Sequence, residues 1–240
     1  MRQEYIGTEL ELFENAHNWK QYWFDIIKPY IGNSILDVGA GIGSTAKLFS
    51  RMPLDCYIAV EPDVENVEAM QEKASLNNFN TAFKCINGGI DVLSDDDLFD
   101  TILYIDVLEH IQDDKNELEI ASKHLIPGGR IIILSPAHQW LFSPFDESVG
   151  HFKRYNKKSL MLAKPDRLIT DRLCYLDSIG IMASASNRLF LRSSNPSKEQ
   201  INFWNNYMVP VSKYTDKLTR FLFGKTILGV FQLPMNSARD

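Results

Sequence analysis

Short apolar segments alternate with helix-like segments along residues 34–134, and this alternation is the strongest constraint on the fold. Strands are predicted over residues 34–38, 56–61, 82–86, 99–106 and 130–134. The segments between them, clearest at 64–76 and 115–125, space their apolar residues as an amphipathic helix does. Strands that alternate with helices form right-handed crossovers and a parallel sheet covered on both faces. We therefore expect a doubly wound α/β fold.

The rest of the chain completes the predicted domain organisation. A sixth strand is expected at 168–176, a helical apolar-rich segment at 180–223 and a closing strand at 224–231. A chain of 240 residues suits one domain, so we expect a single domain over 1–240. Its predicted parts are an N-terminal helix (1–33), a core expected to bind the ligand (34–136), an aromatic lid (137–165), and a sheet completion with a helical insertion (166–240).

Composition excludes several classes of protein. A formal net charge of -6 argues against a sequence-independent nucleic-acid binder, which needs clustered basic charge. The three scattered cysteines lack the spacing of a zinc or redox site, which indicates free thiols in a reducing compartment. Residues 1–16 are polar and acidic, unlike a signal peptide, and no apolar run reaches the ~18 residues of a membrane span. We expect a cytoplasmic protein.

A glycine-rich loop follows the first predicted strand, where doubly wound sheets bind ligands. Gly39, Gly41 and Gly43 allow positive φ angles and a close approach of the backbone to a ligand. We expect free N–H groups of this loop to face the ligand, and Ser44 to cap the next helix. Glu61 ends the second strand, where its carboxylate can accept both hydroxyls of a ribose. A tight structural turn is the alternative interpretation of the glycines.

Two features distinguish this loop from a dinucleotide site. The pyrophosphate of a dinucleotide favours G-x-G-x-x-G, whereas here the third glycine, Gly43, comes one residue early. Asp37, two residues before the loop, would repel a diphosphate but suits a positively charged amino group. The loop therefore favours an adenosine ligand that carries an amino acid.

With these motifs the chain resembles the class I S-adenosylmethionine-dependent methyltransferases. ILDVGAGIGS, AVEPD, FDTILYIDVLEHI and LIPGGRIIILSP resemble the family's motifs in order and spacing over residues 34–136. The segments SPAH, PFDE…GHFKRY, YLDSIG and GKTILGVF resemble a bacterial subgroup associated with surface-polysaccharide, glycolipid or secondary-metabolite pathways. The resemblance implies a Rossmann-like seven-stranded sheet with the last strand antiparallel, and S-adenosyl-L-methionine as the cofactor.

The resemblance also implies the cofactor-binding residues. Gly39, Ala40 and Gly41 would hold the methionyl part, with Asp37 nearby, and Glu61 would hold the ribose. The residues expected near the adenine and beneath the sulfonium are Pro62, Asp63, Gly89, Ile90, Asp91, Asp106 and Val107.

The acceptor side offers two candidate bases, since an oxygen acceptor can need one. His138 follows the fifth strand and His151 lies in the predicted lid. The alternative is that both histidines hold the backbone of the lid. Arg154 and Tyr155 are candidate substrate-binding residues, because arginine pairs with phosphate and aromatic rings stack on sugars. A solvated turn is the alternative at this position.

A metal site is a further alternative. Asp106, Glu109 and His110 follow the fourth strand and could bind a divalent cation together with His151. The sequence LEH also resembles many metal-free members of the family, so we expect no metal. The segment 203–223 alternates apolar and basic residues, which indicates a packed cap helix or, alternatively, a helix at a membrane surface.

The sequence therefore predicts an S-adenosylmethionine-dependent methyltransferase that acts on a small-molecule acceptor. We expect O-methylation in a glycan, glycolipid or natural-product pathway. The alternatives are metal-assisted methylation of vicinal hydroxyls and a non-catalytic adenosine-binding module that regulates a partner. No nucleic-acid partner and no membrane span are expected, and the apolar and basic residues of 203–223 allow peripheral membrane contact.

Overall fold

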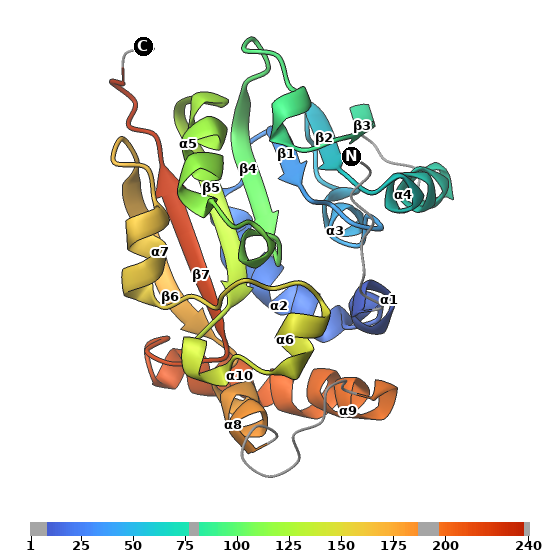
Figure 1. The fold of residues 1–240 in the computed structure, drawn as a ribbon, viewed down its shortest axis with the longest axis vertical. Helices are drawn as coiled ribbons and strands as arrows, with labels where there is room; N and C mark the ends of the chain where they lie inside the picture. Colours follow the sequence, from blue (N-terminus) through green and yellow to red (C-terminus); the bar gives the residue numbers. More distant parts are fainter. Residues whose placement is uncertain (1–8, 77–81, 187–196, 238–240) are drawn as a thin grey trace.

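Seven strands form one sheet in the order β3-β2-β1-β4-β5-β7-β6 (Figure 1). The computed structural model describes residues 9–76, 82–186 and 197–237, so the polar segment 1–8 lies outside the described residues. The strands are β1 Ser34–Val38, β2 Cys56–Glu61, β3 Ala82–Asn87, β4 Phe99–Ile105, β5 Leu125–Pro136, β6 Ile169–Leu176 and β7 Thr226–Gln232. β7 runs antiparallel to β5 and β6, and the other pairs are parallel. The predicted seven-stranded sheet with an antiparallel last strand is confirmed.

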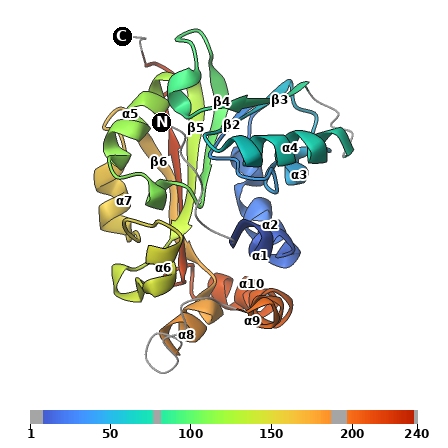
Figure 2. The ribbon, with the colours of Figure 1, turned by 45° about the vertical axis from the view of Figure 1, so that its right-hand side comes forward.

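Helices cover both faces of this sheet (Figure 2). Adjacent strand residues point to opposite sides, as Ile35 and Leu36 do in β1, and each side has its own buried core. The helices are α1 Glu9–Glu14, α2 His17–Ile27, α3 Ala46–Phe49, α4 Val64–Leu76, α5 Asp114–Lys123, α6 Pro144–Ser148, α7 Lys157–Ala163, α8 Ser178–Ser186, α9 Lys198–Phe203 and α10 Val209–Leu218. α2 and α3 pack on one face, whereas α5 and α7 pack on the other.

Several predicted boundaries differ from the structure. β5 begins at Leu125, because Phe99 pairs with it across an irregular register and thereby draws 125–129 into the strand. The helix after the glycine loop begins at Ala46 behind Thr45, so the prediction that Ser44 caps it is wrong. The segment 180–223 is divided by a π-helical turn, Trp204–Met208, between α9 and α10.

The predicted lid, 137–165, is built of short ordered elements. It contains a 3-10 turn Gln139–Leu141 (η4), α6 and α7. Ser143 and Asp146 form a reciprocal cap at the start of α6, and Asn156 and Ser159 form another at α7. Ala137 bridges to Tyr155, which joins the segment to the end of β5. Figure 1 shows α6 and the segment around it beside the lower ends of β4 and β5.

The C-terminal helices bury one side and expose the other. Trp204 and Val209 belong to the core, and Ser212 and Asp216 are buried as well. The exposed apolar side chains on the segment 203–223 are Phe203, Tyr207, Val211, Tyr214, Leu218, Leu222 and Phe223. The predicted packing of a cap helix is therefore correct for one face, and peripheral membrane contact stays a prediction. Within the described ranges, no helix combines the length and apolarity that crossing a bilayer requires.

Candidate active site

The glycine loop adopts left-handed backbone angles at all three glycines. The φ angles are 66° at Gly39, 55° at Gly41 and 78° at Gly43. A Cβ on Gly39 would lie 2.8 Å from both methyl carbons of Val107, so the loop packs directly on the residues that follow β4. The order of the strands reverses between β1 and β4, which is where doubly wound sheets bind ligands.

The loop's backbone amides bind neighbouring protein groups. The N–H groups of Gly39 and Ala40 donate to the Val60 carbonyl at 2.8 and 3.2 Å, and that of Gly41 donates to Glu61 Oε2 at 2.9 Å. The expectation that these N–H groups are free to face the ligand is therefore wrong. Their partners belong to β2, so the amides fix the loop to the neighbouring strand.

Glu61 is the residue that joins the loop to β2. Its carboxylate is 5% exposed and accepts the N–H of Asp63 at 3.0 Å through Oε1, in addition to the bond from Gly41. Burial raises the pKa of Glu61, and these two backbone N–H groups act in the opposite direction. The predicted contact with a ribose stays a prediction, but the acidic group stands at the carboxyl end of β2, as expected.

Asp37 lies beneath the loop. Its carboxylate is 1% exposed and accepts a hydrogen bond from the Tyr57 hydroxyl at 2.6 Å. Burial raises the pKa of Asp37 to about 7. The hydrogen bond from Tyr57 lowers this pKa, and the negative charge of Glu61 raises it. A direct contact with an amino group stays a prediction, and this position favours an indirect role in shaping the loop.

The residues predicted to border the adenine lie at the ends of β2 and β3. Pro62 is exposed, Gly89 is half-buried, and Ile90 is buried at the start of a 3-10 turn, Ile90–Val92 (η2). The side-chain amide of Asn87 donates to the carbonyls of Glu61 and Pro62 at 3.0 and 2.9 Å, which holds the two strand ends together. Asn87 is a positioning residue that the sequence analysis missed.

Asp106 follows β4 with a φ of 55°, a rare angle for a residue that is not glycine. Its N–H donates to the Leu134 carbonyl at 2.8 Å, which secures this turn to β5. Asp106 is exposed to solvent. Neighbouring protein atoms partly desolvate the carboxyl group and raise the pKa of Asp106 to about 6. The positive charges of His151, Lys225 and Lys20 act in the opposite direction and lower this pKa. Asp106 thus lies at the carboxyl end of β4, where the charges of three basic side chains act on it.

His138, one of the two predicted bases, is held by protein contacts. Its φ is 67°, its N–H donates to the Tyr155 carbonyl at 2.6 Å, and its Nε2 lies 3.1 Å from the Gly224 carbonyl. Its ring stacks on Tyr175 with the centroids 4.7 Å apart. These contacts support the alternative role, in which His138 holds the backbone of the lid.

His151, the other predicted base, is oriented by a buried carboxylate. Its Nδ1 lies 2.9 Å from Oδ1 of Asp146, which is fully buried and binds the Arg154 guanidinium through both oxygens at 2.7 and 2.8 Å. Burial alone would raise the pKa of Asp146, but hydrogen bonds from His151 and Arg154 hold that pKa well below its usual value. His151 therefore turns its Nε2 away from Asp146 and towards Glu109, 4.0 Å from Oε1.

The structure does not place the two predicted substrate-binding residues at an open surface. Tyr155 is 1% exposed and donates its hydroxyl to Asp114, so it cannot stack on a substrate ring in this conformation. Arg154 is engaged by Asp146, and its side chain is only 12% exposed. In this conformation both side chains stabilise the lid segment from within, and their contact with a substrate stays a prediction.

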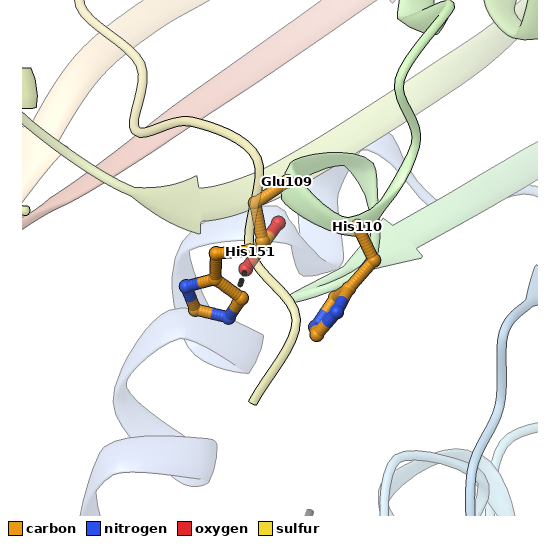
Figure 3. A group of neighbouring side chains, drawn as sticks. All are labelled: Glu109, His110 and His151. Atoms are coloured by element: carbon orange, nitrogen blue, oxygen red, sulfur yellow. Dashed lines mark ion pairs between the residues drawn. The ribbon is translucent and has the colours of Figure 1, made fainter. Parts of the chain in front are cut away.

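Glu109, His110 and His151 come together beside the end of β4 (Figure 3). Glu109 and His110 belong to a 3-10 turn, Leu108–His110 (η3), and one ligand atom of each of the three residues lies within 4.8 Å of the others. Burial is the largest cause that raises the pKa of Glu109, and the charge of Asp106 raises it further. Hydrogen bonds from the backbone N–H of Glu109 and from Ser135 lower this pKa and partly offset the increase. Burial and the charge of His151 lower the pKa of His110 to about 4.

The sequence predicted, as an alternative, a cation group of these three residues together with Asp106, but Asp106 is not one of the three that meet. Asp146 and Ser135, which orient the group from α6 and β5, were not predicted. The only local signal for Asp146 is its position three residues after Ser143, which is typical of a helix start.

Comparisons with known proteins agree with this architecture. A family model described as "Methyltransferase domain" matches residues 12–179. A mitochondrial ubiquinone biosynthesis O-methyltransferase of Dictyostelium discoideum is 25% identical over 141 residues, covering 55% of this chain and 43% of that protein. Norajmaline N-methyltransferase of Rauvolfia serpentina is 26% identical over 150 residues, covering 59% and 47%. The chain therefore matches less than half the length of these curated relatives.

Solved structures share the fold. Coclaurine N-methyltransferase bound to N-methylheliamine and SAH has a TM-score of 0.63 at 15% identity, with 96% of this chain and 83% of that chain covered. The 4+2 cyclase SpnF has a TM-score of 0.62 at 13% identity, with 96% of each chain covered. A shared fold does not fix the reaction, since one of these two proteins is an N-methyltransferase and the other a cyclase.

Proposed function

This chain belongs to the family of methyltransferase domains, and we propose that it transfers the methyl group of S-adenosylmethionine to a hydroxyl group of a small-molecule acceptor. The observation that carries the proposal is the glycine loop at the point of strand reversal, tied to Glu61 through the N–H of Gly41. This arrangement supports an adenosine ligand beyond the carboxyl ends of β1 and β2.

The residues at this edge fit such a cofactor. Gly39 keeps the backbone free of a Cβ, and the Glu61 carboxylate retains lone pairs beyond its two amide hydrogen bonds. When bound, S-adenosylmethionine supplies a methyl group activated by the sulfonium, and the protein supplies binding and alignment. The proposed cofactor residues remain Asp37, Gly39, Ala40, Gly41, Glu61, Pro62, Gly89, Ile90, Asp106 and Val107.

The acceptor is proposed to bind above Asp106, beside His110 and His151. Asp106 is open to solvent at the carboxyl end of β4, and the charge of His151 acts on it. We favour His151 over His138 as the residue that acts on the acceptor, because Nε2 of His138 is already bound to a backbone carbonyl. The hydroxyl proton of the acceptor would pass to Nε2 of His151, whose Nδ1 is held by Asp146.

The acceptor class is argued from resemblance. The named relatives include O-methyltransferases of ubiquinone biosynthesis and an N-methyltransferase, so both atoms occur as acceptors among them. The preference for oxygen, and for a glycan, glycolipid or natural-product pathway, rests on the SPAH and PFDE…GHFKRY segments. Arg154 and Tyr155 within the second segment would act by shaping the lid.

We also propose that residues 1–240 form one domain. The family model ends at residue 179, but β7 lies between β5 and β6, so the sheet requires the C-terminal segment. A cytoplasmic location stays an expectation, since one relative is mitochondrial.

Calorimetry on the full chain tests the proposal. S-adenosylmethionine and its demethylated product should bind, and NAD should not. Formation of the demethylated product is then followed across a panel of hydroxylated small molecules, with amines as the comparison set. Binding of NAD in place of S-adenosylmethionine would contradict the proposal. Cofactor binding without turnover on any acceptor would favour the non-catalytic adenosine-binding module.

A further inference from the structure

We propose that Glu109, His110 and His151 form a binding site for one divalent transition-metal ion such as Zn²⁺. The three side chains come from η3 and from the segment between α6 and α7, and they meet beside the end of β4 (Figure 3). Glu109 Oε1 and His151 Nε2 lie 4.0 Å apart. Ligands at about 2.1 Å from a common ion lie roughly 3 Å from one another, so binding needs these donors to close by about 1 Å.

An unpartnered carboxylate oxygen points to a missing ligand. Glu109 is fully buried, and its Oε2 accepts a hydrogen bond from Ser135 at 2.8 Å. Its Oε1 has no hydrogen-bond partner among the described residues. A buried polar atom without a partner is costly, and a cation between this oxygen and the two imidazoles would remove that cost.

The surroundings orient the proposed ligands as supporting residues do at known metal sites. The Nδ1 of His151 is bound to Asp146, which leaves Nε2 for the ion, and a carboxylate behind a metal-binding histidine is a common arrangement. Asp146 itself accepts hydrogen bonds from Nε and Nη2 of the Arg154 guanidinium. Glu109 is held by Ser135, so two of the three ligands are oriented by further hydrogen bonds.

The donor set indicates which ions suit the site. Two imidazoles and one carboxylate suit zinc, manganese or ferrous iron, whereas magnesium and calcium prefer oxygen ligands alone. Three protein ligands leave a coordination position open, as in catalytic sites. Because Asp106 lies nearby, a bound ion would be placed to hold an acceptor oxygen and lower the pKa of its hydroxyl. With the ion present, Nε2 of His151 would hold the ion instead of acting as a base, and the hydroxyl proton would pass to water. This consequence, but not the binding itself, rests on the proposed function.

The test is metal binding by the full chain after removal of metals with a chelator. Calorimetry with Zn²⁺, and separately with Mn²⁺, should give one ion per chain for at least one of them. Glu109→Gln and His151→Ala should each weaken that binding at least tenfold, and Asp146→Asn about tenfold. His17→Ala is the matched control, because His17 is an exposed histidine at the start of α2, and its affinity should be unchanged.

Two further measurements keep the test decisive. Circular dichroism of each variant reports whether it folds, and Glu109→Gln preserves the shape of the side chain. The proposed site would be overturned if the chain bound neither Zn²⁺ nor Mn²⁺. It would also be overturned if Glu109→Gln and His151→Ala both kept the full affinity of the wild type. Calorimetry of S-adenosylmethionine on the metal-free protein separates the two proposals, since loss of cofactor binding would count against the methyltransferase function and not against the metal site.

Discussion

Oε2 of Glu61 accepts the backbone N–H of Gly41 at 2.9 Å, so the residue proposed to bind the ribose also holds the glycine loop in place. The other oxygen of Glu61 holds the N–H of Asp63. One carboxylate therefore links the loop after β1 to the turn after β2, and removing it should affect cofactor binding in two ways.

We expect Glu61→Ala to weaken S-adenosylmethionine binding by about 1.5–3 kcal/mol, because charge-assisted hydrogen bonds to the ribose are lost. Isothermal calorimetry measures the change. Glu65→Ala on the exposed start of α4 is the control and should bind normally. Unchanged affinity in Glu61→Ala would show that the ribose binds elsewhere.

Gly39→Ala should destabilise the protein by about 1–3 kcal/mol, because a Cβ there meets Val107 at a left-handed φ angle. Urea unfolding measures the loss. Adding Val107→Ala should recover part of it by removing the clash but not the backbone strain. If the double variant recovers nothing, the clash contributes little.

Arg154→Met should cost about 3–5 kcal/mol of unfolding free energy, because it leaves the buried Asp146 carboxylate without its cation. Lys153→Ala, at the adjacent and more exposed pair with Asp114, should cost about 1 kcal/mol or less. Urea unfolding of both variants compares them. Equal losses would mean that Asp146 does not depend on Arg154.

Stability should depend on pH through Asp37. Its folded pKa is about 7 against 3.8 for the ordinary group, so the folded state retains a proton that the unfolded state has already released. The wild type should therefore lose stability relative to Asp37→Asn as pH rises from 4 towards 7. The upper limit of this loss is about 1.4 kcal/mol for each unit of difference between the folded and unfolded pKa values. Urea unfolding at several pH values gives the difference, and a flat difference would contradict the prediction.

His138 and His151 should differ in what they affect. Once an acceptor has been identified, His151→Ala should lower turnover at least tenfold with unchanged S-adenosylmethionine affinity, because it lies on the proposed acceptor side. His138→Ala should mainly lower the melting temperature, since it removes a ring stacked on Tyr175 and a bond to Gly224. The reverse result would restore His138 as the proposed base.

Local patterns were enough to predict most of the sheet. The strand at 56–61 and the helix at 64–76 have the same boundaries in the prediction as β2 and α4 have in the structure. Both were predictable because the run of apolar residues in a buried strand and the spacing of apolar residues in a helix are local patterns of the sequence. The glycine loop was also predictable, since its three left-handed angles need glycine in the sequence itself.

Only the tertiary structure decided what the polar side chains in and around the lid do. Arg154 and Tyr155 were expected to face a substrate, but they bind Asp146 and Asp114 inside the protein. Likewise, Glu109, Ser135, and the pair Asp146 and His151 come from three separate segments of the chain and lie close together. The sequence by itself determined most elements of the sheet, because these follow from the spacing of neighbouring residues, whereas the start of β5 depends on its pairing with β4. Which distant side chains become partners depends on how those elements pack, because burial leaves each polar group dependent on whatever atom the fold brings within reach.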